Sequence, residues 1–208
     1  MRILLVSSNR HDRFVGSVPI RPIPLGLAIL LGALRGSRHR VHLLDLMFAR
    51  APRQAIRRAI ADSSPDLIGI SVRNLDAIGK RRVPRPVGGV HSFLPDIQTW
   101  IRTCRQYSRA PIVLGGPAVS LLSRDAFEAL EPDFLLAGDA SRTLPELAER
   151  VDWEAPWEDL PGLVFREGGE IRVNPPGPWD APQVSPCYEA FDLSRYEAAG
   201  YSIAVLTK

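Results

Sequence analysis

Five short apolar runs recur along the first 151 residues, and each is followed by a segment with helical spacing or helix punctuation. Because polar residues do not alternate within these runs, they suit strands that are buried on both faces of a parallel sheet. The runs span residues 2–8, 40–46, 67–72, 111–114 and 134–137. The helices expected after them span residues 22–36, 52–61, 94–107, 124–130 and 143–151.

This alternation predicts an α/β fold with a five-stranded parallel sheet covered on both faces by helices. Right-handed crossovers favour a doubly wound, flavodoxin-like (Rossmann-like) domain with the strand order 2-1-3-4-5. The segment 22–36 is apolar almost all round, so we expect a deeply packed helix there.

The sequence pattern of the chain changes after residue 151. Two short apolar runs flank Glu167-Gly168-Gly169, which predicts a β-hairpin, and a proline-rich connector follows. The run 201–208 has the pattern of a further buried strand. We therefore expect a domain over 1–151, a hairpin and linker over 152–186, and over 187–208 the start of a second domain that is truncated.

The charge is unevenly distributed along the chain. Residues 1–110 hold 19 Lys and Arg against 6 Asp and Glu, whereas residues 111–208 hold 7 against 17. A basic half can face a polyanion or an acidic part of the same molecule. The basic cluster 80–85 lacks interleaved aromatic residues, so we expect a solvated or cofactor-facing loop there and no nucleic-acid partner.

Composition also bears on the compartment. The longest apolar run, 22–34, is too short to span a bilayer, so no membrane partner is expected. Cys104 and Cys187 are far apart and do not form a disulfide framework. These features predict a cytoplasmic protein.

Several common catalytic motifs are absent from the sequence. There is no G-x-G-x-x-G after the first strand, no G-x-x-x-x-G-K-[ST], no G-x-S-x-G and no H-E-x-x-H. We therefore predict neither a catalytic residue nor a metal ligand within these 208 residues.

A ligand site is expected at the carboxyl ends of the strands, beside the point where the strand order reverses. The loops 7–17 and 73–92 lie there, with the ends of the fourth and fifth strands beside them. Gly115, Gly116 and Gly138 at those ends would let the backbone approach a ligand, although tight strand-to-helix turns explain them equally well.

The order of the motifs resembles that of the cobalamin-binding domain of cobalamin-dependent radical S-adenosylmethionine enzymes. The resemblance rests on PIPLGLAILLGAL, HRVHLLDL, PDLIGISVRN, APIVLGGPAVS, PDFLLAGDASRTLPEL and LPGLVFREGGEIRVNPP, and on AVLTK at residues 204–208. It implies that the chain binds cobalamin as part of a methyltransferase. It also implies that the iron–sulfur cluster and S-adenosylmethionine belong to a missing C-terminal radical domain, which would begin with C-x-x-x-C-x-x-C. The chain alone would then be inactive.

The resemblance also implies which residues bind the cofactor. The end of the third strand would lie beneath the corrin ring, the turns after the fourth and fifth strands would contact the nucleotide tail, and the entrance to the first helix would line the pocket. Asp139 and Ala140 depart from the family pattern G-E-G-E. The implied residues are Pro24, Leu25, Gly26, Ser71, Val72, Arg73, Asn74, Asp76, Gly115, Gly116, Pro117, Gly138, Asp139, Ser141 and Thr143.

One motif of related cobalamin proteins, D-x-H-x-x-G, is missing, so no histidine is placed to ligate cobalt. Arg73 is a candidate neighbour of the lower cobalt face, because a charged guanidinium cannot ligate and would block water there. Arg73 could instead bind a propionamide or pair with Asp76.

Two other functions stay open from the sequence. One is a non-enzymatic, small-molecule-binding regulatory domain of the same α/β fold. The other is a half-domain that binds a nucleotide sugar. An increase in thermal stability on addition of cobalamin would distinguish a cobalamin-binding domain from both of these alternatives.

Overall fold

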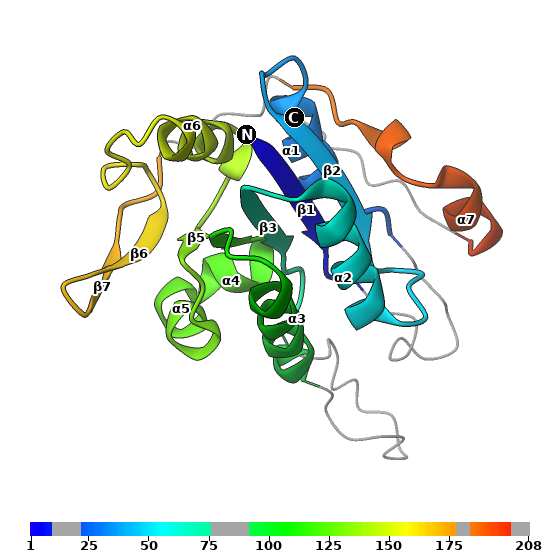
Figure 1. Ribbon diagram of the computed structural model, residues 1–208, viewed down its shortest axis with the longest axis horizontal. Coiled ribbons are helices and arrows are strands. Elements are labelled where there is room, and N and C mark those ends of the chain that lie inside the picture. The colour runs from blue at the N-terminus through cyan, green and yellow to red at the C-terminus, as the bar shows by residue number, and fades with distance from the viewer. Residues whose placement is uncertain (10–21, 76–91, 178–183, 201–208) are drawn as a thin grey trace.

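A seven-stranded sheet with the order β2-β1-β3-β4-β5-β6-β7 organises the chain (Figure 1). The computed structural model describes residues 1–9, 22–75, 92–177 and 184–200. The first five strands are parallel and follow the predicted order, whereas β6 and β7 are antiparallel. The strands are β1 (Arg2–Ser7), β2 (Arg40–Asp45), β3 (Leu67–Ser71), β4 (Ile112–Gly115), β5 (Phe134–Leu136), β6 (Leu163–Glu167) and β7 (Glu170–Val173).

The prediction of a five-stranded sheet was therefore wrong. The hairpin β6–β7 adds to the edge strand β5, where Leu135 pairs with Val164 and Leu136 with Leu163. Because Leu163, Val164 and Phe165 are all buried, the hairpin gains more by extending the core than by standing apart from it.

Helices cover both faces of the sheet (Figure 1). Their apolar residues form two clusters, one with α2, α3, α4 and α5 on one face and one with α1 and α6 on the other. The helices are α1 (Leu25–Leu34), α2 (Pro52–Ser63), α3 (Leu94–Tyr107), α4 (Pro117–Leu121), α5 (Ser123–Leu130), α6 (Ala140–Asp152) and α7 (Leu193–Ala198).

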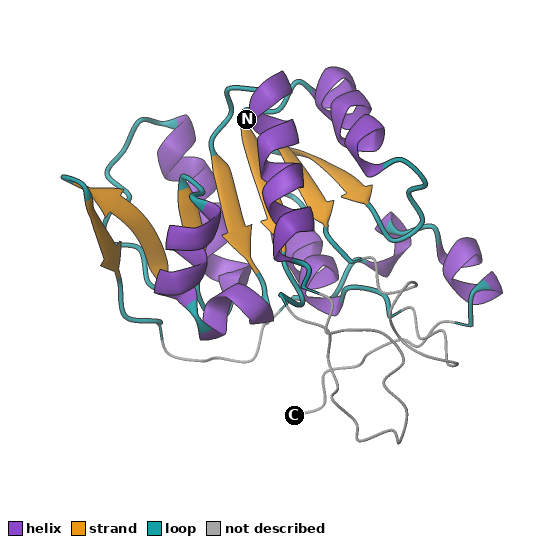
Figure 2. Cartoon of the chain, turned by 90° about the horizontal axis from the view of Figure 1, so that it is seen from below, coloured by secondary structure: helices purple, strands orange, loops and turns teal. Residues whose placement is uncertain are grey.

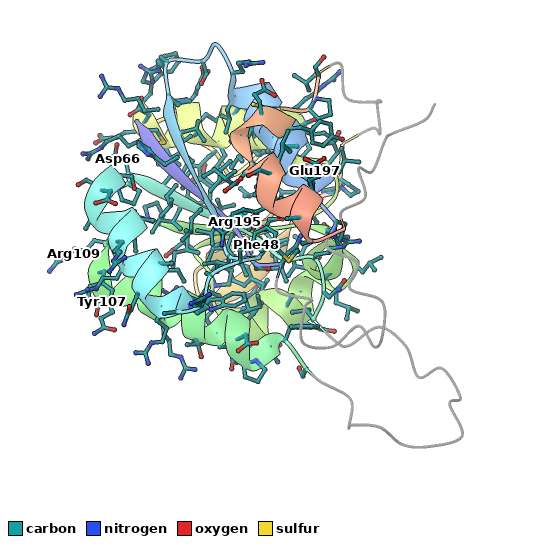
Figure 3. The ribbon with its side chains drawn as sticks, turned by 90° about the vertical axis from the view of Figure 1, so that its right-hand side faces the viewer. Phe48, Asp66, Tyr107, Arg109, Arg195 and Glu197 are labelled. Carbon is teal, nitrogen blue, oxygen red and sulfur yellow. The ribbon has the colours of Figure 1, made fainter. Side chains whose placement is uncertain are left out.

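The C-terminal strap, residues 184–200, packs against α1 and the end of β2. The Cys187 amide donates to the Ala28 carbonyl at 2.9 Å, and Arg35 pairs with Glu189 at 2.6 Å. In α7, the Arg195 guanidinium carbon lies 4.8 Å from the Phe48 ring centroid (Figure 3). The strap explains why α1 has no polar face, since the sheet covers one side of this helix and the strap another. The strand expected at 201–208 lies outside the described residues.

Candidate functional site

The carboxyl ends of β1, β3, β4 and β5 meet at one edge of the sheet (Figure 2). A cavity of about 590 Å³ extends from this edge, lined by these strands, α1, α4 and the beginning of α6. Its size falls within the range of small-molecule sites in proteins. The cavity lies at the strand-order reversal, where the sequence predicted a ligand.

Three residues in register form the sheet side of the cavity. Leu5, Gly69 and Val113 are neighbours across β1, β3 and β4, and each lies two residues before the end of its strand. At about 3.3 Å per residue, the cavity thus reaches roughly 7 Å behind the sheet edge. A Cβ on Gly69 would lie 2.7 Å from Cδ2 of Leu5, so even alanine would disturb this packing.

The two helices on this face supply apolar walls. Leu27 of α1 and Leu144 of α6 are buried and line the cavity. Asp139 begins α6 as its N-cap, since its carboxylate accepts a 2.9 Å hydrogen bond from the Ser141 amide. This cap places Asp139 at the edge of the sheet, where it lines the mouth of the cavity.

The turns after β4 and β5 are joined by one hydroxyl. Ser120 donates from Oγ to the Gly116 carbonyl at 2.9 Å and accepts from the Gly138 amide at 3.1 Å. Gly116 has φ of +108°, and a Cβ there would lie 2.5 Å from the Val72 carbonyl oxygen. Glycine is therefore required at this turn, whether or not a ligand lies beside it.

Asn9 is the buried polar side chain of the cavity lining. It is 4% exposed, and its Nδ2 has no hydrogen-bond partner among the residues that the structure describes. An unpaired buried donor is costly, but this atom has almost no accessible surface, so a ligand would reach it only after the Asn9 side chain moves. The sequence prediction missed Asn9, although its place directly after a buried strand was a usable signal.

Most of the predicted site residues come together. Asn74 does not line the cavity, Asp76 lies outside the described residues, and Val72 packs into the core of the opposite sheet face. Ser141 and Thr143 are buried within α6 and do not line it either. The predicted residues that line the cavity are Pro24, Leu25, Gly26, Ser71, Arg73, Gly115, Gly116, Pro117, Gly138 and Asp139.

The chemistry of the lining is that of a binding site. Its charged side chains, Arg73 and Asp139, are at the sheet edge and the rest of the lining is neutral. Within the described part of the chain, no three His, Cys, Asp or Glu residues are grouped so that they could hold a metal ion. No helix in that part is long and apolar enough to cross a membrane.

A family model described as "B12 binding domain" matches residues 14–148. Among curated proteins, "Uncharacterized methyltransferase PH0819" of Pyrococcus horikoshii is 24% identical to this chain over an alignment 211 residues long. The alignment covers 99% of this chain. "Tryptophan 2-C-methyltransferase" of Streptomyces laurentii is 27% identical over 158 residues, or 74% of this chain.

Two solved structures share the fold. The radical S-adenosylmethionine methyltransferase TsrM of Kitasatospora setae, with cobalamin and a [4Fe-4S] cluster bound, has a TM-score of 0.71 at 25% identity over 89% of this chain. The cobalamin-dependent S-adenosylmethionine radical enzyme OxsB, with aqua-cobalamin bound, has a TM-score of 0.72 at 20% identity over 97% of it.

All four proteins are longer than this chain. It spans 42% and 25% of the two curated relatives, and 31% and 26% of the TsrM and OxsB chains.

Proposed function

Since this chain belongs to the B12 binding domain family, we propose that it binds cobalamin at the described cavity and serves a radical S-adenosylmethionine methyltransferase. The observation that carries the proposal is the cavity itself. It extends from the carboxyl edge of the sheet over the face formed by β1, β3 and β4. Its volume of about 590 Å³ and its mainly apolar lining suit the nucleotide tail of cobalamin.

The residues at the cavity suit such a ligand. Leu5 and Val113 offer apolar side chains on the sheet side of the cavity, and Cδ2 of Leu5 covers Gly69 between them. Nδ2 of Asn9 would donate to an oxygen or nitrogen of the tail once its side chain turns toward the cavity. The macrocycle would then lie over the mouth, which Gly26 and Leu121 border.

When bound, cobalamin supplies a carrier for a methyl group. The chain's own residues orient the cofactor and shield one of its faces. Arg73 is exposed at the end of β3 and lines the mouth, so its guanidinium can lie beneath the ring. A permanently charged guanidinium cannot donate a lone pair to cobalt, and it would keep water from that position.

We propose that the iron–sulfur cluster and S-adenosylmethionine are bound by a radical domain that acts with this chain. A radical S-adenosylmethionine cluster needs three thiolates, and the sequence holds two cysteines that lie 83 positions apart. The 208 residues alone would then bind cofactor without transferring a methyl group. Two free cysteines also support a reducing compartment, and we place the chain in the cytoplasm.

Retention of hydroxocobalamin through gel filtration tests the proposal. We expect the chain to elute with corrin absorbance in a stoichiometric amount, and to gain thermal stability from the ligand. A chain that elutes without corrin at high cofactor concentration would contradict it.

A matched pair of variants places the site. A Cβ at Gly26 would meet nothing within 4 Å, so Gly26→Trp should fold and block the mouth of the cavity. Arg53→Trp is the control, because Arg53 is also the exposed second residue of its helix but lies on α2, away from the cavity. We expect Gly26→Trp to lose the corrin and Arg53→Trp to retain it.

A further inference from the structure

We propose that the C-terminal strap positions α1, so that docking of the strap on this helix and binding of cobalamin are energetically coupled. The inference rests on the proposed function, because it takes cobalamin as the ligand of the cavity. It goes beyond it by assigning control of the cofactor's affinity to residues that do not line the cavity, chiefly Ser185 and Cys187.

The helix α1 stands between the strap and the cavity. A stripe at helical spacing, made of Ala28 and Gly32 of α1 and of Arg35 directly after it, contacts the strap and does not line the cavity. A displacement of α1 along this stripe would therefore move a wall of the cavity, because five of its ten residues line it. They are Leu25, Gly26, Leu27, Ile29 and Leu30.

The strap rests on α1 through its backbone. A Cβ on Gly32 would lie 2.2 Å from the Ser185 carbonyl oxygen, so the strap occupies the space that a side chain would fill. Two residues further along, the Cys187 amide donates to the Ala28 carbonyl at 2.9 Å. Such hydrogen bonds weaken steeply with distance and angle. The strap is therefore either docked in this position or displaced from it.

The strap supplies α1 with contacts that have a direction. Every residue of α1 is aliphatic or glycine, so no side chain of the helix can form a hydrogen bond. The helix also begins without a side-chain cap and without an acidic residue in its first turn. Because apolar packing is non-directional, the hydrogen bond from Cys187 and the ion pair between Arg35 and Glu189 help to fix α1 along its axis.

The far end of the strap is anchored at the carboxyl end of β2. Tyr196 is fully buried there, with its ring centroid 4.9 Å from that of Phe48. The Arg195 guanidinium lies over the same Phe48 ring (Figure 3). Because this end is held separately, the strap can leave α1 without unfolding the domain. Docking on α1 is thus a local equilibrium that a ligand can shift.

Binding measurements on the whole 208-residue chain test the coupling from one side. Gly32→Ala fills the space that Ser185 occupies, and Cys187→Pro removes the amide that bonds to Ala28. Neither position lines the cavity. We expect both variants to bind cyanocobalamin about fivefold or more weakly than the wild type in equilibrium dialysis. Cys187→Ala is the matched control, because it keeps the amide, and it should bind like the wild type.

A second control separates positioning of α1 from a general loss of stability. Ile56→Val shortens a buried side chain of α2 in the apolar cluster on the opposite face of the sheet. It should lower the melting temperature and leave the dissociation constant of the folded protein unchanged. Wild-type affinity in both Gly32→Ala and Cys187→Pro would overturn the inference and leave the proposed function intact. A wild-type chain that does not bind cyanocobalamin would overturn both.

Hydrogen exchange tests the coupling from the other side. Because coupling is reciprocal, cobalamin must strengthen docking by the same factor by which docking strengthens binding of cobalamin. The backbone amides of the strap, followed by mass spectrometry, should exchange about fivefold or more slowly when the wild type is saturated with cyanocobalamin. The amides of α2, on the opposite face, should slow less. Strap exchange that does not respond to bound cyanocobalamin would contradict the inference.

Discussion

The phenol of Tyr196 donates a 2.5 Å hydrogen bond to Oδ2 of Asp45, joining residues 151 positions apart in the sequence. Tyr196 is fully buried, and the Met47 amide donates to the other carboxylate oxygen of Asp45 at 3.1 Å. This contact fastens α7 to the carboxyl end of β2, at the same edge of the sheet as the cavity.

Tyr196→Phe should destabilise the protein. The substitution leaves a largely buried carboxylate with one fewer donor, so we expect the free energy of unfolding to fall by about 1–3 kcal/mol. Urea denaturation monitors the change. Tyr107→Phe serves as the control, because Tyr107 is 45% exposed at the end of α3, and it should shift stability by less than about 0.5 kcal/mol. A loss no larger than that of the control would mean that the contact contributes little.

Stability should depend on pH through Asp45. Burial raises the pKa of Asp45 above its ordinary value, against the lowering effect of the Tyr196 hydrogen bond. The folded state thus holds this proton to higher pH than the unfolded state does, and the free energy of unfolding falls as pH rises through that window. We expect the stability of the wild type relative to Asp45→Asn to decrease as pH rises from the unfolded pKa of an aspartate, about 3.9, through the raised folded pKa of Asp45.

Asp66 provides a control of opposite sign for this pH dependence. Its hydrogen bond with Arg2 lowers the pKa of Asp66, so its contribution is present above the unfolded pKa and disappears as pH falls. The Arg2 and Asp66 side chains are 47% and 40% exposed, so the effect should be small. If the effects of Asp45→Asn and Asp66→Asn on the free energy of unfolding changed with pH in the same way, both pKa directions would be contradicted.

Two glycines of α1 should respond to alanine in opposite ways. A Cβ on Gly32 would lie 2.2 Å from the Ser185 carbonyl oxygen, so Gly32→Ala must displace the C-terminal strap and should lower the free energy of unfolding. Gly26 has open space, and Gly26→Ala should stabilise the helix by up to about 1 kcal/mol. Thermal denaturation of the two variants measures the difference in stability. Equal changes in melting temperature would contradict the prediction.

The two thiols should differ in reactivity. Cys104 is buried in α3, and burial raises its pKa to about 12, so almost no thiolate is present near neutral pH. Cys187 is half-buried in the C-terminal strap. We expect Ellman's reagent to titrate one thiol in the native protein and two after unfolding, with Cys187→Ser removing the fast phase. Rapid reaction of both thiols in the native state would be inconsistent with the packing of α3.

Arg73→Ala should alter the absorption spectrum of the cobalamin-loaded chain. If the Arg73 guanidinium lies beneath the ring as proposed, its removal would open that position to water, and water bound there would shift the corrin bands. Arg102→Ala is the control, since Arg102 lies on α3 and does not line the cavity. A spectrum identical to that of the wild type would show that Arg73 does not face the cobalt.

The parallel core could be predicted from the sequence because each of its strands is an unbroken apolar run. The helix α3 was placed at its observed bounds, 94–107, because Ile97, Trp100, Ile101 and Cys104 recur at helical spacing. The five-residue α4 was missed, because Pro117–Leu121 is too short to show a period. The hairpin β6–β7 was recognised, but its place at β5 depends on a tertiary contact that no local pattern records.

The site could be predicted only in part, for a related reason. Glycines and chain turns at the strand ends mark the mouth of the cavity, and most of the residues predicted there line it. Its inner part consists of strand and helix residues such as Leu5 and Leu144, which in the sequence look like any other core residue. Only the three-dimensional arrangement shows that these side chains surround a space.

The hairpin also protects one border of the sheet from self-association. Among the described strands β7 pairs with β6 alone, so its outer backbone groups could template another strand. Arg172 on this strand forms an ion pair with Glu167 at 3.0 Å, and Glu170 follows the turn. A second molecule adding to this edge would have to desolvate those charges, which disfavours growth of the sheet into filaments.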